Sequence, residues 1–250
     1  MAHPTVRLIV FDKDGVLLDL NRTWMPVIVA MADYLVARLN GRADRDALLA
    51  AVGVKITPGT DTGTIVENGA FAAGTFAEMR EIWAEMEPDL IPVFDDHARY
   101  RADILRISQE TVRGKTVAKG DVLKALMELR AQGFALALAT NDNTESAHIN
   151  LSDMKIRDCF DAIICADSGF GRKPEADGLL ECCRRMGVTP QQSVMVGDTA
   201  TDWAAAHNAG FRGFITIADD APEKPEFIPD TDAVLPSIEG LAEAMQELFV

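Results

Sequence analysis

Two aspartates near the start of the chain, Asp12 and Asp14, have the residue type and spacing for metal-assisted chemistry. They follow Val6–Phe11, a β-branched and apolar segment that predicts a buried strand at the centre of a parallel sheet. If the chain stays extended through Asp14, both carboxylates point to one side at the carboxyl end of that strand, and Lys13 points to the other.

Two close carboxylates repel each other unless a cation lies between them or one of them holds a proton. The pair therefore fits a site for a hard metal such as Mg²⁺, with one carboxylate as nucleophile and the other as acid or base. A solvent-exposed turn has the same short pattern, so the pair alone leaves both interpretations open.

The composition narrows the classes of partner. The 250 residues carry a formal net charge of −15, and the mixture of apolar and charged residues is that of an ordinary globular protein. Because such a chain repels nucleic acid and anionic membrane surfaces, we expect neither as a partner. Any site for a phosphorylated substrate must then be a local group of lysine, backbone N–H groups and metal.

The cysteines and the apolar segments predict a soluble cytoplasmic protein. The four cysteines lack metal-ligand spacing and are expected to be buried and reduced: Cys159, Cys165, Cys182 and Cys183. Asp12 and Asp14 interrupt the first apolar segment too early for a secretory signal. The segment 24–39 contains Pro26 and charged residues, which argues against a membrane span.

Residues 20–113 have a helical pattern throughout. Apolar spacing predicts helices over 24–39, 43–52, 76–86 and 94–112. The segments Thr57–Gly63 and Gly69–Gly74 are rich in turn-forming or small residues and are expected to be loops. Asp95 and Asp96 lie at the start of the last predicted helix and would be a favourable charge pair at its N-terminus.

The pattern changes at Asp121, a plausible N-cap for a helix over Val122–Ala131. Predicted strands then alternate with helices and cover 134–140, 162–165, 193–196, 211–217 and 233–235. This alternation predicts an α/β fold with a doubly wound, Rossmann-like parallel sheet. We expect residues 1–19 and 114–250 to form this catalytic core, and residues 20–113 to form a helical domain inserted after the first strand.

Polar groups follow four of the predicted strands. They are Asp12 with Asp14, Thr140 with Asn141, Lys173 in a Gly-Arg-Lys-Pro loop, and Asp198 with Asp202. Because a parallel sheet brings the carboxyl ends of neighbouring strands together, these groups would meet at one edge. They would supply carboxylates for a metal, a hydroxyl and amides for phosphate oxygens, and a lysine to neutralise developing charge.

In order and spacing, these four segments resemble the motifs of the haloacid dehalogenase-like hydrolase superfamily, and within it the phosphoglycolate phosphatase-like branch. The resemblance extends from about Val6 to Gly210. It implies a phosphatase that uses Mg²⁺ and hydrolyses a small phosphorylated metabolite. It also implies that the helical insertion is a mobile cap that selects the substrate and excludes water.

The resemblance assigns roles to individual residues. It implies that Asp12 is the nucleophile that forms an aspartyl-phosphate, that Asp14 is the general acid/base, and that Lys173 pairs with the nucleophile and the phosphate. Thr140 and Asn141 match the phosphate-binding positions. The implied metal-binding residues are Asp12, Asp14 and Asp198, of which Asp14 binds through its backbone carbonyl. Asp202 completes the implied set by supporting the water shell of the metal.

Two departures from the family pattern keep alternatives open. Position 13 is Lys where many family phosphatases have an apolar residue, and we expect it to form a salt bridge at the surface or behind the metal site. Position 16 is Val, as in sugar phosphomutase relatives, so a β-phosphoglucomutase-like activity is an alternative. A non-catalytic metal- or phosphate-binding module is a further alternative. The sequence indicates neither the substrate nor the oligomeric state.

Overall fold

The computed structural model describes residues 5–57, 60–66, 69–218 and 230–249, and the chain divides into two compact units. The core unit comprises Met1–Asp19 and Val117–Val250, and the inserted unit comprises Leu20–Thr116.

The core unit is built on a six-stranded sheet with the order β5-β4-β1-β6-β7-β8, in which every neighbouring pair is parallel. The strands are β1 (Leu8–Phe11), β4 (Ala135–Ala139), β5 (Ala162–Ile164), β6 (Ser193–Gly197), β7 (Gly213–Ile217) and β8 (Ala233–Leu235). β1 lies inside the sheet, where Phe11 is level with Leu138 of β4 and Val196 of β6. The predicted α/β fold with a parallel sheet is confirmed.

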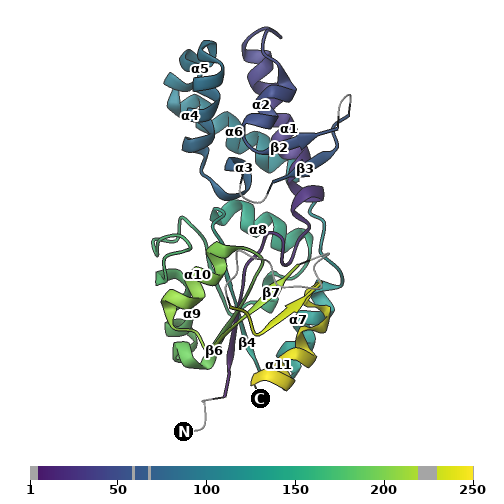
Figure 1. Cartoon of the computed structure of the whole chain (residues 1–250), viewed down its shortest axis with the longest axis vertical. Helices are drawn as coiled ribbons and strands as arrows, with labels where there is room; N and C mark the ends of the chain where they lie inside the picture. Colours follow the sequence, from purple (N-terminus) through teal and green to yellow (C-terminus); the bar gives the residue numbers. More distant parts are fainter. Residues whose placement is uncertain (1–4, 58–59, 67–68, 219–229, 250) are drawn as a thin grey trace. The chain divides into compact units, whose positions relative to one another are not determined.

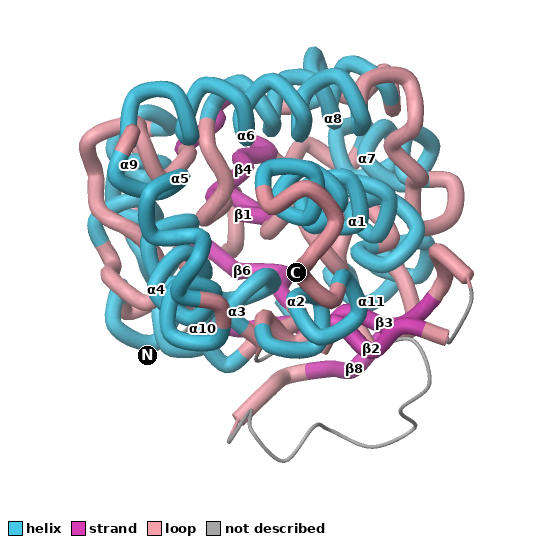
Figure 2. Tube along the Cα trace, turned by 90° about the horizontal axis from the view of Figure 1, so that it is seen from above, coloured by secondary structure: helices cyan, strands magenta, loops and turns pink. Residues whose placement is uncertain are grey.

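Helices cover both faces of this sheet (Figure 1). One face carries α7 (Val122–Ala131), α8 (Thr144–Asp153) and α11 (Leu241–Phe249), and the other carries α9 (Asp177–Met186) and α10 (Ala200–Ala209). Figure 2 shows β4, β1 and β6 in a row, with α9 and α10 on one side of the row and α7 and α11 on the other. This covering explains why the strands are apolar along their whole length rather than alternately polar.

Side chains of β1 alternate between the two faces. Ile9 and Phe11 pack in the cluster with α7 and α11, whereas Leu8 and Val10 pack in the cluster with α9 and α10. Continued alternation directs Asp12 towards the α9 and α10 side and Lys13 towards the opposite side. The strand thus separates two consecutive charged residues at its carboxyl end.

The inserted unit is mainly helical. Its helices are α1 (Leu20–Arg38), α2 (Arg45–Ala51), α3 (Ala70–Ala73), α4 (Phe76–Met86), α5 (Ile91–Asp95) and α6 (His97–Val112). The longest two, α1 and α6, pack together. Trp83 of α4 is fully buried, and its Nε1 donates a hydrogen bond of 2.9 Å to the Leu48 carbonyl.

Two details of the predicted helical insertion are wrong. The unit contains an antiparallel pair of strands, β2 (Val54–Ile56) and β3 (Gly63–Ile65). The pair flanks the segment that was expected to be a turn, and residues 58 and 59 of that segment lie outside the described residues. Alternating β-branched residues favour this pairing, but each strand is too short to give a clear period. The Gly69–Gly74 segment contains α3 rather than a continuous loop.

The helix expected over 94–112 is divided at Asp96, which caps α6 by accepting a hydrogen bond from the Arg99 N–H. The four cysteines are buried and free, as expected. Across the described ranges, the structure contains no helix with both the length and the apolar character needed to cross a membrane.

Candidate active site

Three carboxylates from two adjoining strands meet at the edge of the core sheet. Asp12 directly follows β1, and its N–H donates a hydrogen bond of 2.9 Å to the carbonyl of Val196 in β6. Asp198 directly follows β6, and Asp202 lies in the first turn of α10. One oxygen from each of the three carboxylates lies within 4.8 Å of the other two. The parallel pairing of β1 with β6 thus assembles this set.

Lys173 joins two of these carboxylates. Its Nζ lies 2.5 Å from Asp12 Oδ1 and 2.5 Å from Asp202 Oδ1, and the residue is 9% exposed. Lys173 comes from the loop between β5 and α9, so it reaches the site from the same side of the sheet as Asp12. A buried ammonium in contact with two carboxylates is well placed to offset negative charge.

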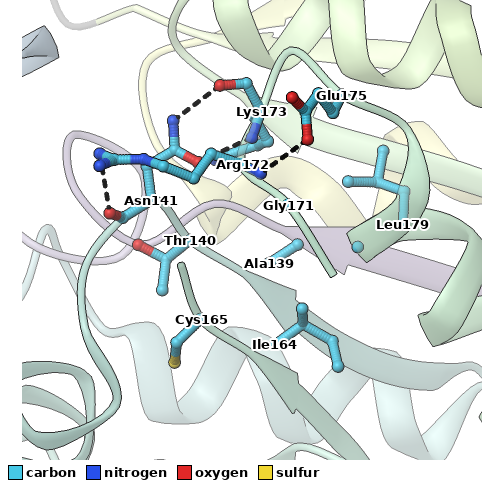
Figure 3. A pocket seen from close by; sticks show the side chains of 11 residues that line it. Ala139, Thr140, Asn141, Ile164, Cys165, Gly171, Arg172, Lys173, Glu175 and Leu179 are labelled. Atoms are coloured by element: carbon cyan, nitrogen blue, oxygen red, sulfur yellow. Dashed lines mark hydrogen bonds between the residues drawn. The ribbon is translucent and has the colours of Figure 1, made fainter. Parts of the chain in front are cut away.

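Asn141 holds the Lys173 loop in place. The Lys173 N–H donates to Asn141 Oδ1 at 2.8 Å, and Asn141 Nδ2 donates to the Lys173 carbonyl at 2.9 Å (Figure 3). Thr140, which precedes it at the end of β4, is buried and accepts a hydrogen bond from the Asp142 N–H through its hydroxyl. Thr140, Asn141 and Lys173 line one small pocket, together with Arg172 and Cys165.

Asp202 has both carboxylate oxygens in contact with the protein. Oδ1 receives Lys173, and Oδ2 receives the Thr199 hydroxyl at 2.7 Å and the Thr199 N–H at 3.1 Å. These bonds to Thr199 form a capping box at the start of α10. Asp202 therefore both caps the helix and extends towards the site.

Asp198 is the carboxylate with unused hydrogen-bonding capacity. Its Oδ1 is buried and has no hydrogen-bond partner among the described residues. Its Oδ2 lies against Gly15, where an added Cβ would come within 1.8 Å of it. Gly15 has a φ of +76°, so both its conformation and the space beside it require glycine.

Burial and neighbouring charges shift the pKa values of these groups. The pKa of Asp12 is raised to about 7, because burial, Asp202 and Asp14 together outweigh the lowering by Lys173. Burial and the neighbouring Asp202 and Asp12 also raise the pKa of Asp198 well above its usual range. For Lys173, burial would lower the pKa, but Asp12 and Asp202 outweigh it and raise the pKa, so the amine stays charged.

The donor set fits the Mg²⁺ ion expected from the sequence. Mg²⁺ binds oxygen ligands, and the site offers carboxylate oxygens, one of which lacks a partner in the described part of the chain. Three carboxylates that share one ammonium carry excess negative charge when they ionise, and a divalent cation offsets it. Asp12 and Asp198 are the better placed direct ligands, because both oxygens of Asp202 already accept hydrogen bonds.

Asp14 pairs with a different lysine from the one that contacts Asp12 and Asp202. The chain bends at Lys13 instead of staying extended, and Leu17 donates its N–H to the Lys13 carbonyl at 2.9 Å. The Asp14 carboxylate accepts from Lys13 Nζ, with Oδ1 at 3.0 Å and Oδ2 at 2.9 Å. The Asp14 side chain is 25% exposed, whereas those of Asp12 and Asp202 are 10% and 1% exposed.

The expectation that Lys13 forms a salt bridge is confirmed, and of the two expected positions the one at the surface is wrong. Lys13 is 0% exposed, and Nζ also contacts Asp142 Oδ2 at 3.1 Å and Asn150 Oδ1 at 2.7 Å. Burial would lower the pKa of Lys13, but Asp14 and Asp142 outweigh burial and raise it.

Asp142 and Asn150 were missed by the sequence reasoning. Asp142 follows Thr140 and Asn141 in a Thr-Asn-Asp-Asn segment, where a carboxylate so close to a candidate phosphate-binding position was the available signal. Asn150 lies in the middle of α8 and has no local signal, because its contact with Lys13 spans 137 positions of sequence.

The family model of the haloacid dehalogenase-like hydrolases matches residues 6–210. The chain belongs to the haloacid dehalogenase-like hydrolase family. This match confirms the predicted family. The relatives that are phosphatases support the prediction that the chain is a phosphatase enzyme.

Among relatives of this hydrolase, phosphoglycolate phosphatase from Shigella dysenteriae is 30% identical over 218 residues, which cover 82% of this chain and 79% of the relative. Two solved structures share the fold. A predicted phosphoglycolate phosphatase from Haemophilus somnus has a TM-score of 0.70 at 20% identity and covers 97% of this chain and 99% of its own. A phosphatase of the same superfamily from Thermococcus onnurineus has a TM-score of 0.68 at 19% identity and covers 98% and 100%.

Proposed function

We propose that this hydrolase is a Mg²⁺-dependent phosphatase that cleaves a small phosphomonoester through an aspartyl-phosphate on Asp12. Phosphoglycolate is the first candidate substrate, because curated relatives at 30% identity carry that name. The observation that carries the proposal is the buried contact of Lys173 with both Asp12 and Asp202, beside the unpartnered Asp198 oxygen.

In the first half of the proposed reaction, a carboxylate oxygen of Asp12 attacks phosphorus. A bond forms between Asp12 and phosphorus as the bond to the ester oxygen breaks, and Asp14 donates a proton to the leaving oxygen. Lys173 offsets the charge that accumulates on the transferring group. Thr140 and Asn141 are proposed to contact phosphate oxygens, and Asn141 also holds the Lys173 backbone.

In the second half, Asp14 removes a proton from a water molecule, which attacks phosphorus and releases inorganic phosphate. Asp12 leaves as a carboxylate and is ready for another cycle. Mg²⁺, when bound by Asp12, Asp198 and the Asp14 carbonyl with support from Asp202, supplies positive charge that favours ionised Asp12 and neutralises the phosphoryl group. One acid/base residue serves both halves because donating its proton to the leaving oxygen leaves it as a carboxylate, the form that can take a proton from water.

We also propose that the inserted unit is the cap domain that selects the substrate, as the family resemblance implies. The predicted boundaries, 20–113, fall close to those of the compact unit Leu20–Thr116. A cytoplasmic location and a small phosphorylated metabolite as partner belong to the same proposal.

The test is phosphate release from a panel of small phosphomonoesters that includes phosphoglycolate, with Mg²⁺ or with EDTA. We expect release that requires Mg²⁺ and is lost in Asp12→Asn, which retains the shape of the side chain but not its nucleophilic oxygen. Release without a bisphosphate activator separates a phosphatase from a phosphomutase. Well-folded protein that binds Mg²⁺ and turns over no ester would overturn the proposal.

A further inference from the structure

In sequence, Lys13 lies between Asp12, the proposed nucleophile, and Asp14, the proposed acid/base. In the structure, the Lys13 side chain lies on the opposite side of the sheet from the residue that contacts Asp12. Asp12 contacts Lys173 on the α9 and α10 side, whereas Lys13 contacts Asn150 of α8. The side chain of Lys13 is fully buried. Burying an ammonium group is costly unless partners fill its hydrogen-bonding positions, so its surroundings should show what it is for.

The ammonium group of Lys13 has three N–H donors and lies beside oxygen atoms of three residues. Nζ donates hydrogen bonds to Asn150 Oδ1 at 2.7 Å and Asp14 Oδ1 at 3.0 Å, and it forms ion pairs with Asp14 Oδ2 at 2.9 Å and Asp142 Oδ2 at 3.1 Å. These acceptors come from three separate segments: α8, the loop after β4, and the loop after β1. Lys13 thus ties Asp14 to two other elements of the core unit.

Two of these acceptors are themselves held firmly. Asn150 is fully buried within α8, whose N-cap is Asn143. Asp142 Oδ1 accepts from the Asn143 N–H at 2.7 Å and from Asn143 Nδ2 at 3.1 Å. Asp14 differs, because its side chain is 25% exposed and its loop bends away from the strand. The ammonium therefore links a partly exposed carboxylate to two fixed groups.

We propose that Lys13 is a positioning residue that holds the Asp14 carboxylate for proton transfer, with Asp142 and Asn150 as its fixed frame. The inference rests on the proposed function, in which Asp14 is the acid/base. Without Lys13, Asp14 loses its ion pair and gains access to other side-chain rotamers, and the fraction of time in the productive geometry falls.

The experiment uses the double variant Lys13→Met/Asp142→Asn, because Lys13→Met alone would leave Asp142 buried and without its cation. The substrates are 4-nitrophenyl phosphate, whose leaving group needs little protonation, and 4-methoxyphenyl phosphate, which is similar in size and needs more. We expect kcat/KM to fall by about tenfold or more for the methoxy ester and by less than about threefold for the nitro ester.

The decisive comparison repeats the measurement in an Asp14→Asn background. If Lys13 acts through Asp14, replacing Lys13 and Asp142 in that background costs no further activity on either ester. The matched control is Lys124→Met, which removes a lysine from α7 whose side chain is 71% exposed, and it should retain wild-type rates. Thermal unfolding tests whether each variant is folded. If the double variant is not folded, Asn150→Ala, which keeps every charge, is used for the same comparison.

Equal losses on both esters, or a further loss in the Asp14→Asn background, would overturn the positioning role. Wild-type protein that hydrolyses neither these two esters nor any ester of the panel above with Mg²⁺ would instead refute the proposed function, and the positioning role with it. The two failures are distinguishable because the first leaves a wild-type activity that Asp12→Asn abolishes.

Discussion

Raising the pH of the metal-free protein should weaken its fold, and the buried Asp12 sets the size of the effect. Burial raises the pKa of Asp12 from its ordinary value of 3.8 to about 7. Between these values the folded protein retains a proton that the unfolded chain has released. The stabilisation is therefore complete below pH 4 and is lost as the pH rises through 7.

The magnitude follows from the two pKa values. Between pH 5 and pH 8, ionisation of Asp12 should lower the free energy of unfolding by about 3 kcal/mol. For a chain of this length, that loss corresponds to a decrease in Tm of roughly 5–10 °C. Bound Mg²⁺ favours the ionised carboxylate, so a saturating concentration should remove most of the decrease.

The assay is thermal unfolding in EDTA and in Mg²⁺ across this pH range, with Asp12→Asn as the matched control. The variant cannot ionise at position 12 and should lose less stability than the wild type between pH 5 and pH 8. A decrease in EDTA that is the same in both proteins would refute the reasoning, because Asp12 would then not be the group that releases the proton.

Three further predictions concern single side chains. Gly15→Ala places a Cβ 1.8 Å from Asp198 Oδ2 and should weaken Mg²⁺ binding, measured by titration calorimetry, by about tenfold or more; unchanged affinity would show that Asp198 is not a ligand. Asn141→Ala removes two hydrogen bonds to the Lys173 backbone, each worth about 1 kcal/mol, and should lower kcat. An unchanged kcat would mean that the Lys173 loop keeps its position without these two bonds. Trp83→Ala leaves a cavity in the inserted unit and should lower the free energy of unfolding of that unit, measured in urea, by about 3–5 kcal/mol. A decrease of less than about 1 kcal/mol would contradict the packing described.

Local chemistry made several elements predictable. The helix Phe76–Met86 has the predicted bounds, and Asp121 caps the helix Val122–Ala131 as expected. These elements carry their own start signals, because a capping side chain and an apolar period both lie within a few residues. The β2–β3 pair was missed because strands of three residues show too little of their period, and their pairing depends on contacts across a turn.

The candidate site was predictable as far as its strand ends. Asp12, Asp198, Asp202 and Lys173 meet in the structure because parallel pairing brings the ends of neighbouring strands together. The burial of Lys13 was not predictable, since alternation gives the direction of a side chain but not what covers it. The cover comes from α8, and no local pattern connects two residues 137 positions apart.

The central claim is that phosphate is transferred to Asp12. The most direct measurement is rapid acid quenching of the wild-type protein during turnover, followed by mass spectrometry of the peptide that contains Asp12. The account predicts a phosphoryl group on Asp12 that hydroxylamine removes, that forms with Mg²⁺ but not with EDTA, and that is absent from Asp12→Asn. Turnover with a phosphoryl group on a different residue, or undiminished turnover by Asp12→Asn, would contradict it.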